Sequence, residues 1–214
     1  LSSDTATRPT PAMREAIAHA EVGDEQRGED PTVNELQRRA AELLGQEAAL
    51  FVVTGTMCNR LGVAAWTRPG DVVVIERDAH LMRYETGGPA LMSGILFEQL
   101  PGDRGTFTPE QLDEVMTEGT VHIPPTTLVA LEQTHNMAGG AIWPLDRYRA
   151  VADLAHDRGA KVHVDGARLL NAVVEATAKA GARYAWVPRR AGDRGAIEAG
   201  CLPTLLPGGR PVAN

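Results

Sequence analysis

The sequence has few cysteines and no long apolar run. Its two cysteines, Cys58 and Cys201, lie far apart and form no Cys-x-x-Cys motif, which indicates neither a disulfide framework nor a zinc site. No apolar stretch approaches the roughly 18 residues that a membrane span requires. The first residues, LSSDTATRPTP, lack the basic and apolar parts of a signal peptide. We therefore expect no membrane contact and a cytoplasmic location.

The chain also has no excess of positive charge. Its net charge is −7 at pH 7, and an acidic surface repels phosphates and anionic lipid. We therefore expect no nucleic-acid partner. The 214 residues, 43% of them hydrophobic, suffice for one sizeable core. This composition favours a globular protein that acts on small molecules.

Apolar segments alternate with amphipathic ones along most of the chain. Buried strands are predicted at residues 48–53, 72–76, 95–100 and 127–133 and in AKVHVD, which ends at Asp165. Helices are predicted at 32–45, after TGT at 54–56, around 81–92, at 108–116 and at 144–159. Strands that alternate with helices at this spacing predict an α/β fold with a mostly parallel sheet flanked by helices.

Two of the helices carry capping signals. Thr32 and Glu35 match a capping box, and Gly45 ends that helix. Thr108 and Gln111 match a second box, with a proline at the first helical position.

The character of the sequence changes after Thr177. Of the last 37 residues, 23 are Ala, Gly, Arg or Pro, without sustained periodicity. We expect one domain over 1–177 and an irregular tail over 178–214, in which only RYAWVP (183–188) has a strand-like pattern.

Residues with chemical potential follow the predicted strands. Gly55 and Thr56 open a helix, where backbone N–H groups suit a phosphate, although a plain Gly-Thr turn has the same letters. His80, His135 and Asp165 also stand at strand ends, which share one crevice in a parallel sheet. Each histidine alone is more often structural. Their coincidence at one edge favours a site, and Arg168 would adjoin it.

Several motifs, taken in order, resemble one family. They are SSDTATRPTPAM, VGDEQRGEDPTVNELQ, TGTMCN, AHLMRYETGG, LEQTHN and HVDGARLLNA. The sequence is similar to the threonine aldolases from Ser2 to about Val174. These belong to the fold-type-I pyridoxal-phosphate (PLP) enzymes, which also include the aromatic amino acid β-eliminating lyases. The resemblance implies the PLP-dependent transferase-like large domain, incomplete at the C-terminus.

The resemblance also implies a cofactor, pyridoxal 5'-phosphate. Gly55, Thr56 and Met57 match its phosphate-binding turn, and His80 matches the histidine that stacks on its ring. Asp165 matches the acid that pairs with the protonated ring nitrogen, which keeps the cofactor an electron sink. No metal is implied.

The implied reaction is that of a PLP-dependent aldehyde-lyase. It cleaves β-hydroxy-α-amino acids, such as threonine or allo-threonine, to glycine and an aldehyde. Ser3 and Arg168 match groups that bind the substrate carboxylate. His135 matches a histidine that, with His80, takes the β-hydroxyl proton. Relatives build their sites across subunits, so a homo-oligomer, a dimer or tetramer, is implied.

One family feature is missing from the sequence. The lysine that binds the cofactor as a Schiff base lies in a Ser-Lys-Gly stretch, but the matching window here reads RRAGDRGAIEAG. The only lysines are Lys161 and Lys179, and neither context matches. We expect a truncated or frameshifted aldolase with impaired catalysis. The alternatives are a noncatalytic PLP-binding or interaction module, or a β-eliminating lyase of the same superfamily.

Overall fold

The structure is a computed structural model that describes residues 6–180 and 199–200. The described residues fall into two compact units, divided between Phe51 and Val52. The first holds α1 (Pro11–Ala18), a short 3-10 helix (Glu25–Arg27) and α2 (Pro31–Leu44). The second holds the sheet and the remaining helices.

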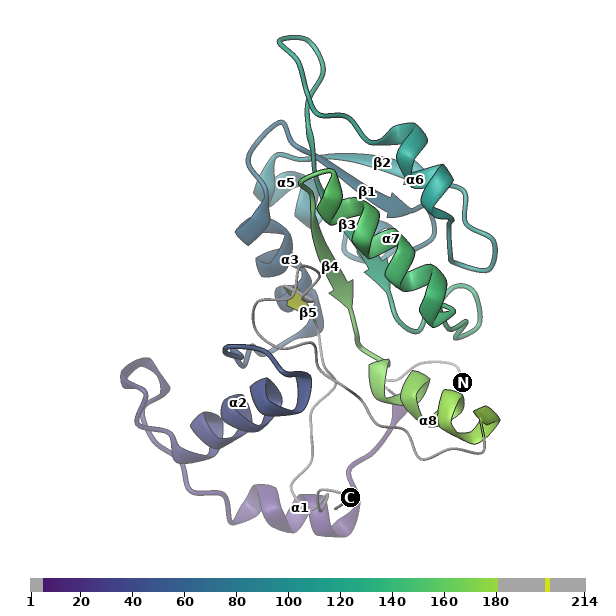
Figure 1. The fold of residues 1–214 in the computed structure, drawn as a ribbon. Coiled ribbons are helices and arrows are strands. Elements are labelled where there is room, and N and C mark those ends of the chain that lie inside the picture. The colour runs from purple at the N-terminus through teal and green to yellow at the C-terminus, as the bar shows by residue number, and fades with distance from the viewer. Residues whose placement is uncertain (1–5, 181–198, 201–214) are drawn as a thin grey trace. The chain divides into compact units, whose positions relative to one another are not determined.

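The second unit is built on a five-stranded sheet with the order β2-β1-β3-β4-β5 (Figure 1). Its strands are β1 (Val72–Glu76), β2 (Leu96–Leu100), β3 (Thr126–Glu132), β4 (Lys161–Asp165) and β5 (Ala199–Gly200). Every neighbouring pair is parallel. The prediction of an α/β fold with a mostly parallel sheet is therefore confirmed.

Helices cover both faces of this sheet. Alternate strand residues point to opposite faces, so Val74, Val129 and Val162 join one core cluster with α6 (Pro109–Val115) and α7 (Leu145–Asp157). Val73 and Ile75 join the other cluster, which includes Val63 of α3 (Gly55–Trp66). Three further helices are α4 (His80–Arg83), α5 (Gly88–Ser93) and α8 (Leu169–Ala180). Both faces of β1, β3 and β4 are thus buried, as continuous apolar strands require.

Of the two predicted ends of α2, the C-terminal one is confirmed and the N-terminal one is wrong. Gly45 ends the helix with a left-handed φ of 65°, as expected. The N-cap, however, is Asp30 rather than Thr32. The Asp30 Oδ1 accepts hydrogen bonds from the backbone N–H groups of Thr32 and Val33, both at 2.9 Å. A carboxylate ahead of a proline at the first helical position satisfies these donors, and Glu35 pairs with nearby arginines instead. The second predicted box, Thr108 with Gln111, is confirmed.

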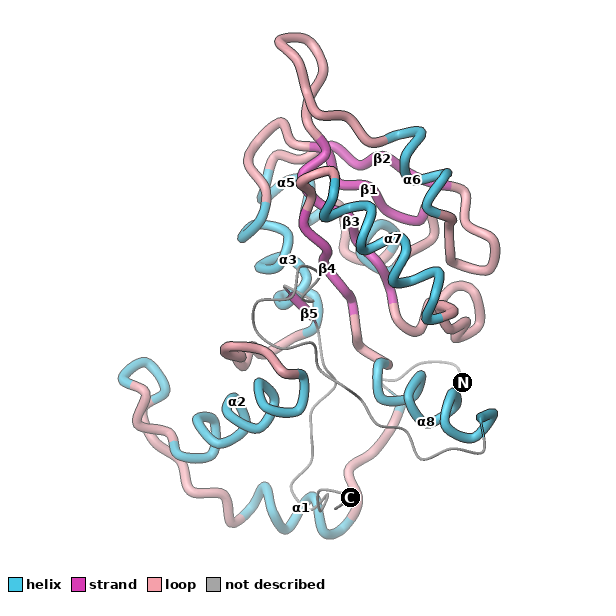
Figure 2. The backbone as a smooth tube through the Cα atoms, viewed as in Figure 1, coloured by secondary structure: helices cyan, strands magenta, loops and turns pink. Residues whose placement is uncertain are grey.

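Two other predicted elements are wrong. Residues 48–53 form no strand (Figure 2), and Leu50 and Val53 are exposed. An apolar run becomes a strand only where a neighbour pairs with its backbone, and this run has no such partner in the described sheet. The single helix predicted around 81–92 is two short helices, because Thr86 and Gly87 adopt positive φ values of 56° and 67°.

The tail differs in one place from the prediction of irregular structure. Ala199 and Gly200 pair in parallel with His163 and Val164 of β4. The predicted strand at 183–188 lies outside the described residues. Within residues 6–180 and 199–200, no helix is long and apolar enough to cross a membrane.

Candidate active site

Three acidic residues end three neighbouring strands. Glu76, Glu132 and Asp165 close β1, β3 and β4, and Glu132 is in register with Asp165. Because the strands are parallel, these side chains meet at one edge of the sheet. All three are buried. Buried carboxylates require hydrogen-bond partners, and those partners define the site.

Asp165 is held by an amide from α3. The Nδ2 of Asn59 donates to Asp165 Oδ2 at 2.9 Å and to Glu85 Oε1 at 2.7 Å. The Oδ1 of Asn59 lies 2.9 Å from the Nε2 of His163, one of the buried residues of β4. Asp165 Oδ1 accepts from the backbone N–H of Ala167 at 3.2 Å. Both oxygens of Asp165 are therefore used as acceptors.

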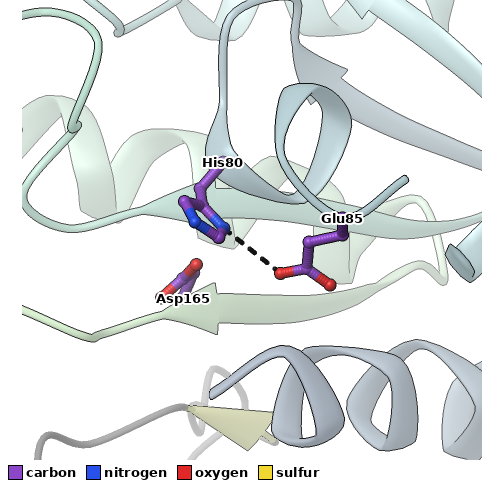
Figure 3. A group of neighbouring side chains, drawn as sticks. All are labelled: His80, Glu85 and Asp165. Carbon is purple, nitrogen blue, oxygen red and sulfur yellow. Dashed lines mark hydrogen bonds and ion pairs between the residues drawn. The ribbon is translucent and has the colours of Figure 1, made fainter. Parts of the chain in front are cut away.

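His80 faces this acidic pair from the start of α4. Its Nδ1 lies 3.3 Å from Glu85 Oε1, and Figure 3 shows the imidazole, Glu85 and Asp165 drawn together. The His80 side chain is 35% exposed, so part of its ring is accessible. The hydrogen bond with Glu85 raises the pKa of His80, with the charge of Asp165 acting in the same direction.

His135 lies in a second, deeper cluster. Its Nε2 is 2.8 Å from Glu76 Oε2 and 3.8 Å from Glu132 Oε2. Its Nδ1 accepts from the backbone N–H of Ala138 at 3.3 Å, so the neutral ring carries its proton on Nε2. The residue is 1% exposed. His135 therefore lies beneath the site rather than at its surface.

Glu132 connects the two clusters. Its Oε2 accepts from the backbone N–H of His80 at 2.8 Å, and its Oε1 accepts from that of Asn136 at 2.9 Å. Burial raises the pKa of Glu132. One carboxylate thus holds the backbone at His80 and lies beside the ring of His135.

The predicted phosphate turn is a helix start, although no strand precedes it. Thr54 caps α3 by accepting from the N–H of Met57 at 3.0 Å, and Gly55 and Thr56 form the first turn. The first N–H groups of a helix have no intrahelical acceptor and carry the positive end of its dipole. Asn59 lies in the same helix, so α3 connects this N-terminal turn to Asp165.

Of the two residues predicted to bind the substrate carboxylate, the structure describes only Arg168. Arg168 is partly buried at the start of α8, close in sequence to Asp165. Ser3 lies outside the described residues. Among the residues predicted from the sequence, His80 and Asp165 are thus brought together directly. Gly55, Thr56 and Met57 lie in the first turn of α3, the helix that carries Asn59.

Sequence reasoning missed the residues that connect the site. Asn59, His163, Glu76 and Glu132 were not among the predicted functional residues. A signal was present for the two glutamates, since each ends an apolar strand in the same way as Asp165. Nothing in the sequence marks Asn59 beyond its place in TGTMCN, because its partners lie 26 and 106 residues away.

A cation between these groups is disfavoured. In the described part of the chain, the ligand atoms of His80, Glu85 and Asp165 lie within 4.8 Å of one another, close enough for a metal ion. The Asn59 Nδ2 already bridges the two carboxylates with N–H donors. Those positively polarised hydrogens oppose a cation there, so the cluster is a hydrogen-bonded network.

Residues 1–186 match the sequence pattern of the beta-eliminating lyase family, so the chain belongs to that family. Low-specificity L-threonine aldolase 1 of Arabidopsis thaliana is 38% identical over 178 residues, which are 81% of this chain and 50% of that protein. The low specificity L-threonine aldolase of Escherichia coli (strain K12) is 38% identical over 175 residues, 81% of this chain and 52% of that protein.

The fold is similar to that of a threonine aldolase of known structure. The solved structure from Leishmania major matches with a TM-score of 0.70 at 21% identity, covering 80% of this chain and 50% of that one. These comparisons confirm the family resemblance and the fold class. The chain spans about half the length of the curated relatives named here.

We predict that Gly105 is required for the position of His135. A Cβ at Gly105 would lie 2.2 Å from the His135 ring, whereas one at Gly139 would meet nothing within 4 Å. Both residues have similar positive φ values, 77° and 73°, so Gly139→Ala is a matched control for backbone strain. Gly139→Ala should cost about 1–2 kcal/mol of unfolding free energy, and Gly105→Ala about 1–3 kcal/mol more. Equal costs in urea denaturation would contradict the close approach.

We also predict that Glu85→Gln lowers the pKa of His80. The hydrogen bond that raises this pKa would then be made to a neutral amide instead of a charged carboxylate. The folded-state pKa is raised, so protonated His80 adds stability below its unfolded pKa. That stability is lost as pH rises through the folded pKa. NMR titration of the His80 ring measures the change. Glu98→Gln, on an exposed residue of β2, is the control. An unchanged His80 titration in Glu85→Gln would reject the pairing.

Proposed function

We propose that this chain forms the PLP-binding part of a threonine-aldolase-type lyase, which cleaves β-hydroxy-α-amino acids to glycine and an aldehyde. Membership of the family supports the proposal. The observation that carries it is that the buried Asp165 carboxylate lies close to the partly exposed His80 imidazole at the carboxyl edge of the sheet. A carboxylate held as an acceptor beside an aromatic ring suits a flat, cationic heterocycle.

The residues present fit PLP. Asp165 would pair with the ring nitrogen and His80 would stack on the ring. The first turn of α3, from Gly55 to Met57, would hold the phosphate. When bound, PLP supplies an electron sink for charge that develops at the substrate Cα. The acidic surroundings of Asp165 favour the protonated ring nitrogen on which that sink depends.

The remaining groups would act on the substrate. Arg168, and Ser3 by resemblance, would bind the substrate carboxylate. His80 would take the β-hydroxyl proton on Nε2, because its Nδ1 faces Glu85. The buried His135 would have to break its hydrogen bond with Glu76 before its Nε2 could take that proton. We therefore propose that His135 acts by keeping Glu132 and the backbone at His80 in place.

The lysines support impaired catalysis by this chain alone. Lys161 begins β4, and its Nζ lies 4.9 Å from the centre of the Trp66 ring. Strand geometry separates its Cα from that of Asp165 by about 13 Å, so Lys161 stands at the far end of the strand from the site. Lys179 lies in α8 without the family context. A noncatalytic PLP-binding module is accordingly the second candidate function. A cytoplasmic homo-oligomer remains part of the proposal by family resemblance.

We predict that the chain binds PLP reversibly and that Asp165→Asn weakens binding at least about tenfold, equivalent to about 1.4 kcal/mol. Absorbance titration measures the affinity. Asp157→Asn, on an exposed residue of α7, is the control. Borohydride reduction followed by peptide mapping should label neither lysine, and threonine should release little glycine. Equal PLP affinity in Asp165→Asn would contradict the site. A labelled Lys179 with glycine release would contradict the impairment.

A further inference from the structure

We propose that Asn59, supported by His163, is a positioning residue that holds the carboxylates of Asp165 and Glu85 as hydrogen-bond acceptors and so aims Asp165 at the ligand. The inference deepens the proposed function, on which the identity of the ligand rests. The hydrogen-bonded network itself can be tested without any ligand.

The first step is the orientation of the buried Asn59 amide, that is, which of its ends carries the N–H donors. Asn59 is 2% exposed and has partners on β4 and after α4. Its Nδ2 has two hydrogens and two carboxylate oxygens within 2.9 Å. The reverse orientation would set the amide oxygen against both carboxylates. The amide therefore donates to Asp165 and Glu85, and its Oδ1 is left to accept.

The second step is the state of His163. Because Asn59 Oδ1 can only accept, the His163 Nε2 at 2.9 Å must carry a proton. Its Nδ1 is buried without a hydrogen-bond partner among the described residues. Burial of this ring lowers its pKa, which favours a neutral imidazole protonated on Nε2 alone. His163 thus locks the amide by a single directed hydrogen bond.

The third step concerns the effect of the fixed Asn59 amide on the carboxylates of Asp165 and Glu85. Carboxylates this close, without a donor between them, tend to share one proton. A protonated Asp165 would itself be a donor and could not pair with a protonated ring nitrogen. The two N–H groups of Asn59 stabilise both negative charges together. The Nδ1 of His80 lies 3.3 Å from the same Glu85 oxygen that accepts from Asn59.

The test begins with the wild-type chain without cofactor. Long-range 1H–15N spectra report the tautomer of each histidine, and His163→Gln assigns the signal of His163. We expect His163 neutral at pH 7 with its proton on Nε2. A cationic ring, or a proton on Nδ1, would overturn the inference. This measurement needs no folded Asn59 variant and no PLP binding.

Variants then separate charge from packing. Asn59→Asp keeps the size of the side chain but replaces the donor with a third acid, whereas Asn59→Ala removes it. Both should change the His163 signal and weaken PLP binding at least about tenfold, with Asn59→Asp losing at least as much as Asn59→Ala. Asn34→Asp and Asn34→Ala in α2, where the amide donates to the Gly28 carbonyl, are the matched controls.

The outcomes for the inference and for the function are distinguishable. If Asn59→Asp binds PLP as the wild type does and leaves His163 unchanged, Asn59 is a packing residue and the inference fails. If the wild-type chain does not bind PLP while His163 has the expected tautomer and responds to Asn59→Asp, the proposed function fails and the network stands.

Discussion

The site depends on one buried amide, whose hydrogen bonds join α3, β4 and the segment that carries Glu85. Its partners Glu85 and Asp165 lie 26 and 106 residues from Asn59 in the sequence. Without these bonds, two carboxylates would lie close together in a region of low polarity, a costly arrangement. The same amide connects α3, which begins at Gly55, to the acid that ends β4.

The parallel sheet supplies the frame on which this amide acts. Its register brings the last residues of β1, β3 and β4 to a common edge, and each of these residues is an acid. The apolar residues before them are buried on both faces, which fixes the strand ends. Glu132 then ties the backbone at His80 to the deeper cluster around His135. The described acidic strand ends thus lie at one edge, while the preceding residues of β1, β3 and β4 form hydrophobic core.

Periodicity in the sequence predicted four of the five strands in the described sheet, because each is a short apolar run, and β1, β3 and β4 are buried on both faces. It failed at 48–53, where an apolar run lacks a pairing neighbour, and at Thr32, where Asp30 offered a stronger cap. Asp165 and His80 could be singled out because they follow strands. Asn59 and His163 could not, since a hydrogen bond between distant residues leaves no local pattern. Family resemblance assigned roles to residues but did not reveal the amide that holds them.

The proposed role of Asp165 is to pair its carboxylate with a positively charged ring nitrogen. The most direct measurement is the 15N resonance of the ring nitrogen in 15N-labelled PLP bound to the chain near neutral pH. The ring nitrogen should be protonated in the wild-type chain and should lose its proton when Asp165 is replaced by asparagine. A ring nitrogen that is unprotonated in the wild-type chain, or unchanged by that substitution, would contradict the role assigned to Asp165.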